Sequence, residues 1–133
     1  MLELVAILTA GFLVFLSAAI QHANTVSTLG LGFVFTDRAK PLAREGFAGR
    51  AARTLQNNLE SAAMFVPGAA IVTLLDRTDA VTMLAAGTYI AARLGFTASY
   101  WFGASRPRSF FWGIGMAAIA VTSAMAALAV VAA

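Results

Sequence analysis

The chain has 133 residues, of which 60% are hydrophobic and 11% are charged, and its formal net charge is +3. A soluble domain has roughly a quarter of its residues charged, so this composition strongly favours a membrane protein over an ordinary soluble one. The absence of cysteine excludes disulfides, thiolate metal sites and cysteine nucleophiles, and a single histidine excludes a histidine-based metal cluster within one chain. The basic residues flank apolar segments, as membrane orientation requires, so we expect no nucleic-acid partner.

The first apolar segment, Leu4 to Ile20, carries no charge and predicts a transmembrane helix over about residues 3–24. A cleaved signal peptide is the competing interpretation, because Ser17-Ala18-Ala19 resembles a small-residue cleavage site. A signal peptide begins with basic residues, whereas this chain begins Met1-Leu2-Glu3-Leu4. We therefore expect the helix to be retained.

Residues 25–49 are the longest connection that the sequence predicts. Gly30 and Gly32 loosen this segment and Pro41 interrupts it. We expect a loop, with a short amphipathic turn lying at the membrane interface.

The rest of the chain predicts three more helices, over about residues 48–75, 80–102 and 108–131. Pro67 and Gly68 should kink the second or loosen one of its turns. A tight polar turn over 76–79 and a basic loop over 103–109 join these helices, and short connections favour antiparallel neighbours. The fold class is therefore an all-α integral membrane bundle of four transmembrane helices, in a single domain over residues 1–133.

The basic residues predict the orientation of this bundle. Eight of the nine fall toward one side: Arg38, Lys40, Arg44, Arg50, Arg53, Arg93, Arg106 and Arg108. Only Arg77 falls on the other side, beside two aspartates. By the positive-inside rule the first side is cytoplasmic, so both termini face away from the cytoplasm. We expect a multi-pass protein of a bacterial-type inner membrane or an equivalent one.

Three polar residues open the second helix at helical spacing. Arg53, Asn57 and Glu60 lie at i, i+4 and i+7, which puts them on one face. They run directly into apolar sequence, where polar groups are costly unless they face protein or a water-filled cavity. The functional interpretation is a pocket that binds carboxylates and an amine, and the alternative is a solvated helix end.

Arg93 lies well inside the third helix, followed by Phe96 and Tyr100 at i+3 and i+7. An arginine in a membrane span snorkels to the headgroups or pairs with another group. Glu60 is the only acid outside the loops and the extreme start of the chain. We expect Glu60 and Arg93 to approach each other within the bundle, with snorkelling as the alternative.

A third cluster lies around the turn into the fourth helix. It comprises Tyr100, Arg106, Arg108 and Ser109. On physical grounds alone these residues also fit ordinary membrane flanking, as an aromatic belt with positive-inside charges.

Together these motifs resemble the MAPEG family, the membrane-associated proteins in eicosanoid and glutathione metabolism. The likeness is carried by Arg53-x3-Asn57-x2-Glu60, then Arg93-x6-Tyr100, then a basic turn into the last helix, and it extends over nearly the whole chain. One departure is Phe96, where some members have histidine.

The resemblance implies a homotrimer of four-helix protomers, with a glutathione site between subunits that opens to the cytoplasm. By the same resemblance, the glutathione-binding residues are Arg53, Asn57, Glu60, Arg93 and Tyr100. Arg106 or Arg108, with Ser109, would sit near the thiol as the catalytic residues, and no metal is implied. A free thiol has a pKa of about 8.5, and a nearby cation or hydroxyl donor makes it a better nucleophile at neutral pH.

Three functions follow as hypotheses. The first is glutathione-dependent transfer to, or peroxide reduction of, a lipophilic electrophile that enters from the bilayer lipid. The second is a non-catalytic MAPEG-like scaffold or accessory subunit of a membrane assembly. The third is a small transporter subunit, in which an intramembrane Arg–Glu pair would also occur.

Overall fold

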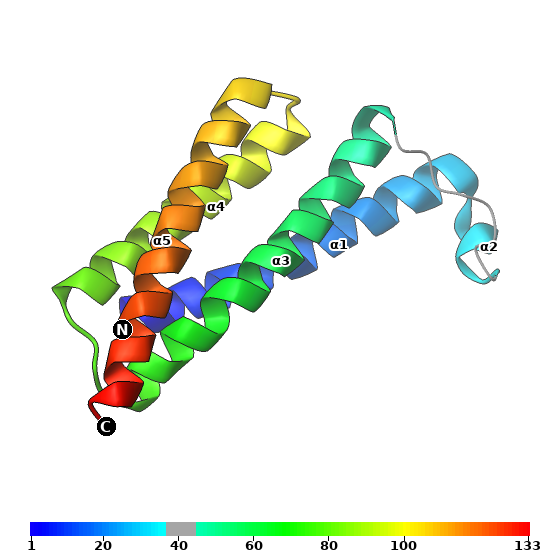
Figure 1. Cartoon of the computed structure of the whole chain (residues 1–133). Coiled ribbons are helices and arrows are strands. Elements are labelled where there is room, and N and C mark those ends of the chain that lie inside the picture. The colour runs from blue at the N-terminus through cyan, green and yellow to red at the C-terminus, as the bar shows by residue number, and fades with distance from the viewer. Residues whose placement is uncertain (37–44) are drawn as a thin grey trace.

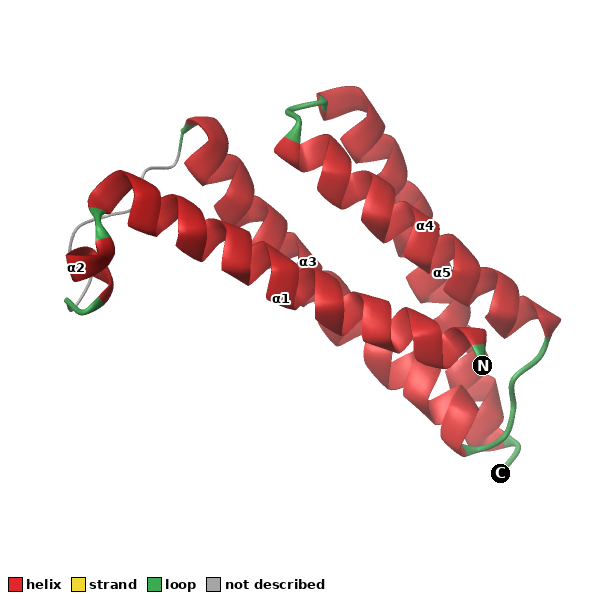
Figure 2. Ribbon diagram, turned by 180° about the vertical axis from the view of Figure 1, so that it is seen from behind, coloured by secondary structure: helices red, strands yellow, loops and turns green. Residues whose placement is uncertain are grey.

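The computed structural model describes residues 1–36 and 45–133, and within them the chain forms helices and no strand. The helices are α1 (Leu2–Leu29), α2 (Leu31–Val34), α3 (Gly46–Leu74), α4 (Ala80–Trp101) and α5 (Ser105–Val131) (Figure 1). The protein is therefore all-α, with four long helices and one of a single turn among the described residues. Figure 2 shows the same arrangement from behind.

The long helices pack as two antiparallel pairs. α1 packs most extensively on α3, and α4 on α5, while α1–α4, α3–α4 and α3–α5 contacts join the pairs. Both termini lie at one end of the bundle, together with the α3–α4 turn (Figure 1). The α4–α5 turn and the start of α3 lie at the other end, where the two pairs diverge in both views.

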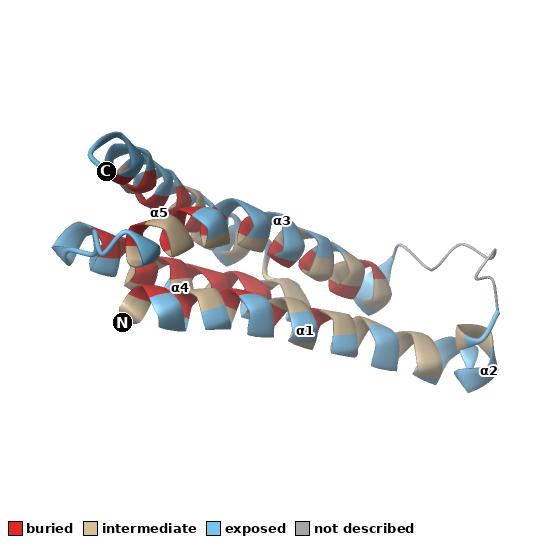
Figure 3. Ribbon diagram, turned by 90° about the horizontal axis from the view of Figure 1, so that it is seen from below, coloured by how far each residue is buried: buried red, intermediate tan, exposed pale blue. Residues whose placement is uncertain are grey.

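Two helices, α1 and α5, are long and apolar enough to cross a membrane, each with a mean hydropathy of 2.2 over its best window. Their outward faces carry large apolar side chains, including Leu8, Phe12 and Phe15 on α1 and Leu128 on α5. Figure 3 shows the exposed residues turned outward and the buried ones turned toward the other helices. Such an outer surface suits lipid or a neighbouring subunit better than water.

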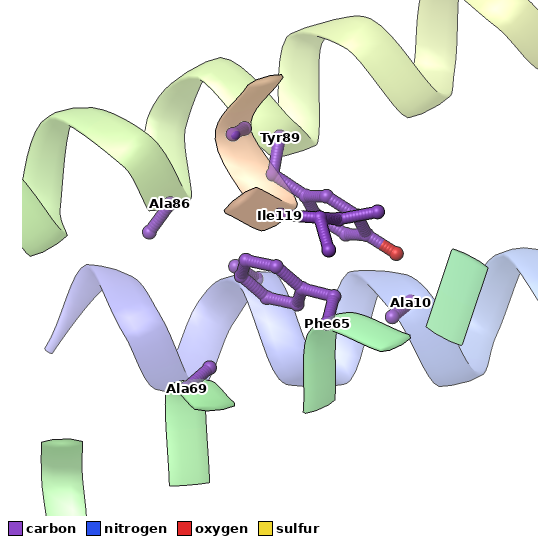
Figure 4. Close-up of a cluster of buried hydrophobic side chains, with 8 residues drawn as sticks. Ala10, Phe65, Ala69, Ala86, Tyr89 and Ile119 are labelled. Carbon is purple, nitrogen blue, oxygen red and sulfur yellow. The ribbon is translucent and has the colours of Figure 1, made fainter. Parts of the chain in front are cut away.

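Small residues and two stacked rings fill the middle of the bundle. The rings of Phe65 and Tyr89 stack with their centroids 3.7 Å apart (Figure 4). Around them pack Ala6, Ala10, Ala69, Ala86, Ala118 and Ile119. Alanine lets helix backbones approach closely, and the stacked pair of rings packs among these small residues. The Tyr89 hydroxyl lies 3.1 Å from the Ser61 hydroxyl, so its polar atom is satisfied.

The predicted loop over residues 25–49 is partly helical, so this prediction was wrong at both ends. α1 continues to Leu29, and the hydroxyls of Thr25 and Thr28 donate to carbonyls four residues earlier. Gly30 then ends α1 with φ at +82°, a conformation that only glycine adopts easily. Arg38, Lys40, Pro41 and Arg44 lie outside the described residues.

The predicted basic loop over 103–109 is also shorter than expected, because α5 begins at Ser105. Arg106, Arg108 and Ser109 therefore lie on the first turns of a helix. Pro107 does not prevent this, since the backbone N–H that proline lacks would have no partner in the first helical turn.

The polar turn over residues 76–79 is fixed by its own side chains. The Asp79 carboxylate accepts hydrogen bonds from the backbone N–H groups of Val81 and Thr82, while the Thr82 hydroxyl accepts one from the Asp79 N–H. This reciprocal capping box starts α4. α3 remains a continuous helix through Pro67. A Cβ atom added at Gly68 would lie 3.3 Å from the Thr122 side chain on α5, so the glycine leaves room for that helix.

Candidate functional site

The first predicted site residues lie along α3 with graded exposure. Arg53 and Glu60 are exposed in the protomer, and Asn57 is half-buried between them. Because they belong to one unbroken helix, their separations are set by the helical rise of about 1.5 Å per residue.

Arg93 is almost fully buried, with 3% of its surface exposed. Its Nη1 donates to Asn57 Oδ1 at 3.0 Å, and its Nη2 donates to Asn58 Oδ1. The guanidinium also lies over the ring of Phe96, 4.4 Å from the centroid. The side chain therefore turns into the protomer and is satisfied by neutral oxygens and an aromatic face, instead of reaching toward headgroups.

Asn58, which the sequence did not single out, connects Arg93 to two further polar side chains. Its oxygen binds Arg93, while its Nδ2 donates to Ser17 Oγ at 2.8 Å and to Thr97 Oγ1 at 3.2 Å. One residue of α3 thus links α1 and α4. A signal was present in the sequence, because Thr54, Asn58 and Ser61 form a polar stripe at i, i+4 and i+7 that faces inward.

One cavity of about 100 Å³ lies between α3, α4 and α5, and we call it the Glu60 cavity. Its lining residues are Asn57, Glu60, Ser61, Met64, Arg93, Trp112, Gly115, Met116 and Ile119. Glu60 and Arg93 both line this cavity, but no ion pair joins them among the described residues. Glu60 instead accepts a hydrogen bond from Gln56 Nε2 at 2.8 Å, one turn back on the same helix.

A second cavity of about 220 Å³ lies where the start of α3 meets the α4–α5 turn, and we call it the Arg108 cavity. Its lining residues are Gly46, Arg50, Arg53, Ser99, Tyr100, Gly103, Ala104, Ser105 and Arg108. Three of these nine residues are arginines, and no acidic residue lines the cavity among the described residues.

Two of the arginines that line the Arg108 cavity contact residues at the end of α4. Arg108 lies over the ring of Tyr100, 5.0 Å from its centroid. Arg50, which the sequence analysis did not place in the site, donates from Nε to the carbonyl oxygen of Trp101 at 3.3 Å. That contact ties the start of α3 to the end of α4, where a cation is favoured by the helix dipole.

The structure separates the three residues predicted near the thiol. Arg108 lines the cavity beside Tyr100, whereas Arg106 and Ser109 do not line it. The Ser109 hydroxyl donates to the Ser105 carbonyl oxygen at 3.2 Å, within its own helix, and both Arg106 and Ser109 are exposed. Of the two arginines left open by the sequence, Arg108 is the one that joins Arg53 and Tyr100.

A comparison with known protein families decides what kind of protein carries this arrangement. The model of the MAPEG family matches residues 2–128, nearly the whole chain. This chain belongs to the MAPEG family. With the apolar helices α1 and α5, that membership makes it an integral membrane protein.

Members of the MAPEG family generally use glutathione and are generally oligomeric. No curated protein and no solved structure matches this chain. The activity of this MAPEG protein is therefore inferred from its own cavities.

Proposed function

We propose that this MAPEG protein uses glutathione to conjugate a lipophilic electrophile or to reduce a lipophilic peroxide. The active form would be a homotrimer of four-span protomers. Its site would open to the cytoplasm between subunits, and its second substrate would enter from the bilayer.

The observation that carries this proposal is the distribution of charge over the two cavities. The Arg108 cavity is lined by three arginines and by no acidic residue among its described residues, and the Glu60 cavity is lined by one carboxylate. Glutathione carries two carboxylates and one ammonium, which is the complementary set. Guanidinium groups bind carboxylates through two parallel hydrogen bonds, and Glu60 is suited to accept from the ammonium.

The spacing of these groups also fits a tripeptide. Arg53 and Glu60 are seven residues apart on α3, which corresponds to about 10 Å along the helix axis. Three extended residues span about 10 Å as well. One molecule of glutathione can therefore reach from the arginines at the start of α3 to Glu60.

Arg108 and Tyr100 would act on the thiol, which glutathione supplies as the nucleophile or reductant. A fixed cation stabilises a thiolate and lowers its pKa from about 8.5. Arg108 is held over Tyr100, so its charge stays in place, and the Tyr100 hydroxyl can donate a hydrogen bond to an anionic sulfur.

The orientation is supported by the distribution of the described basic residues. Arg50, Arg53, Arg106 and Arg108 lie at the end of the bundle with the α4–α5 turn, while Arg77 lies at the end with both termini. By the positive-inside rule, the first end faces the cytoplasm.

Glutathione binding to the protein purified in detergent tests the proposal. We expect glutathione to raise the melting temperature, by an amount equivalent to about 2.7 kcal/mol at a hundredfold excess over Kd, and a thiolate absorbance to develop. The particle should contain three 13.8 kDa chains by mass. Arg53→Ala and Glu60→Ala should lose both signals.

Arg77→Ala serves as the matched control. Arg77 donates to the Ala132 carbonyl at the opposite end of the bundle, so this variant should bind glutathione like the unmodified protein. If the unmodified trimer is folded yet neither binds glutathione nor forms the thiolate, the proposal falls and a non-catalytic scaffold or accessory subunit becomes the better interpretation.

A further inference from the structure

We infer that Arg106 binds the phosphate of an anionic phospholipid, at a site on the outer surface of the bundle that Phe102 and Phe110 flank. The lipid belongs to the leaflet on the side of the α4–α5 turn (Figure 1). This inference is independent of the proposed function, because Arg106 does not line the Arg108 cavity and the proposed glutathione chemistry does not use it.

The guanidinium of Arg106 is not engaged within the protomer. Arg50 donates to the Trp101 carbonyl oxygen, and Arg108 lies over the ring of Tyr100. Arg106, by contrast, is exposed and makes no hydrogen bond, ion pair or ring contact with any residue that the structure describes. Its five N–H donors are therefore open to an acceptor from outside the protomer.

The position of Arg106 along α5 puts it at the level of the lipid headgroups. The part of α5 that follows Arg108 carries no charged residue, and at about 1.5 Å per residue it is about 34 Å long. The hydrocarbon core of a bilayer is about 30 Å thick, and the headgroup layers add roughly 5–7 Å on each side. Arg106 lies about 4.5 Å before Ser109, where the uncharged part begins, and therefore falls within one of these layers.

Two exposed aromatic side chains accompany Arg106. Phe102, in the α4–α5 turn, is 88% exposed, and Phe110 is 64% exposed. Phe110 follows Arg106 by four residues, so the two side chains share one face of α5. It lies on the hydrocarbon side of the guanidinium, where its ring is removed from water by the acyl chains that begin below the phosphate. A cation followed by an apolar group toward the membrane centre matches the layers of a phospholipid.

The charge around Arg106 favours an anionic lipid over a zwitterionic one. Residues 102–112 contain two arginines and no acidic residue. A zwitterionic headgroup would bring its own ammonium toward these guanidinium groups, whereas phosphatidylglycerol has no ammonium. Each basic residue near an anionic membrane surface strengthens the attraction by about fivefold.

The two tryptophans of the chain can report which lipid occupies this site. Trp101 ends α4 and Trp112 lies two turns into α5, so one lies on each side of Arg106 along the chain, and Trp112 is 48% exposed. The purified protein is reconstituted in phosphatidylcholine vesicles that contain a fixed fraction of a brominated lipid. That lipid is either phosphatidylglycerol or phosphatidylcholine, with the same acyl chains. Bromine quenches tryptophan fluorescence on contact, so the ratio of the two quenching curves gives the preference between the headgroups.

The unmodified protein should prefer phosphatidylglycerol by about fivefold. Arg106→Gln should lose this preference, and Arg106→Lys should keep it, because an ammonium also binds phosphate. Arg108→Gln is the matched control. It removes the same charge two residues away, where the side chain lies over Tyr100, and it should keep most of the preference. Melting curves show that each variant is folded.

Three results would overturn the inference. Equal quenching by both brominated lipids in the unmodified protein would mean that no such site exists. An equal loss of preference in Arg106→Gln and Arg108→Gln would mean that the lipid responds to the summed charge of the turn and not to Arg106. A preference that disappears when inorganic phosphate replaces chloride at constant ionic strength would assign the site to free phosphate. Glutathione binding is measured separately, so none of these results decides the proposed function.

Discussion

Asn58 lies at the centre of a buried polar network that joins three helices. It accepts from a buried cation and donates to two hydroxyls that come from different helices. A hydrogen bond to a charged group contributes about 1.5–3 kcal/mol, and a buried group left without its partner costs a similar amount. This residue therefore supports both the packing of the bundle and the position of Arg93.

Replacing Asn58 with leucine of similar size should lower the free energy of unfolding by about 2 kcal/mol. The leucine leaves the Arg93 Nη2, Ser17 and Thr97 groups without that partner. Thermal unfolding in a fixed detergent measures the effect. Thr73→Ala is the control, because the Thr73 hydroxyl donates to the Ala69 carbonyl of its own helix and to no other helix among the described residues. Equal melting temperatures for the two variants would contradict the importance assigned to Asn58.

At the scale of single residues, the sequence predicted which candidate residues share a helix but not which hydrogen bonds they make. Helical spacing correctly put Arg53, Asn57 and Glu60 along α3, because that relation is local. The partner of Arg93 could not be read in the same way, because it depends on how α3 and α4 are rotated against each other. That rotation turns Asn58, the neighbour of the predicted Asn57, toward the guanidinium.

Among the elements, the contact between α4 and α5 depends on a glycine. A Cβ atom added at Gly95 would lie 2.7 Å from the ring of Phe111, which is closer than van der Waals contact allows. α4 and α5 are joined by the turn that carries the Arg108 cavity. Their close packing therefore bears on the geometry of that cavity.

Gly95→Ala should destabilise the protein by about 1–3 kcal/mol, the range for overpacking. Gly113→Ala, on α5, is the matched control, because its Cβ would meet nothing within 4 Å. Alanine also favours the helix there, by up to about 1 kcal/mol. The two variants should therefore shift the melting temperature in opposite directions. A stabilised Gly95→Ala would mean that the Phe111 ring moves aside at no cost.

The sequence identified the long helices more readily than the places where they end. Apolar runs of membrane length indicate a helix clearly, as α1 and α5 illustrate. The ends depend on weaker and local effects. The hydroxyls of Thr25 and Thr28 donate hydrogen bonds to carbonyl oxygens of their own helix, where α1 runs beyond its predicted end. Pro107 fits into the first turn of α5, although proline commonly marks a loop.

On the scale of the whole molecule, the proposed orientation in the membrane follows from the distribution of the basic residues. The arginines of the Arg108 cavity lie at the end opposite to both termini, and Arg77 with its two aspartates lies at the end that carries the termini. The proposed function places the first end in the cytoplasm, where glutathione is available.

Because the chain has no cysteine, single cysteines report this orientation without interference. Thr78→Cys, in the α3–α4 turn, and Ser105→Cys, at the start of α5, are both at exposed positions. A membrane-impermeant maleimide added to intact cells reaches only the periplasmic or external side of the membrane, and there it should label Thr78→Cys. It should label Ser105→Cys only in inverted vesicles. The reverse pattern would place the arginines outside the cytoplasm and remove the supply of glutathione.

The continuity of α3 has one more consequence. Each polar cluster includes a charged residue of α3, Arg53 in one and Glu60 in the other, so the distance between these two residues along the helix cannot change to suit the compound that binds. A thiol as short as free cysteine could touch one cluster but not both, and a longer peptide would overrun them. Under the proposed function, the fixed rise of the α3 helix would thus set the length of the cellular thiol that the protein selects.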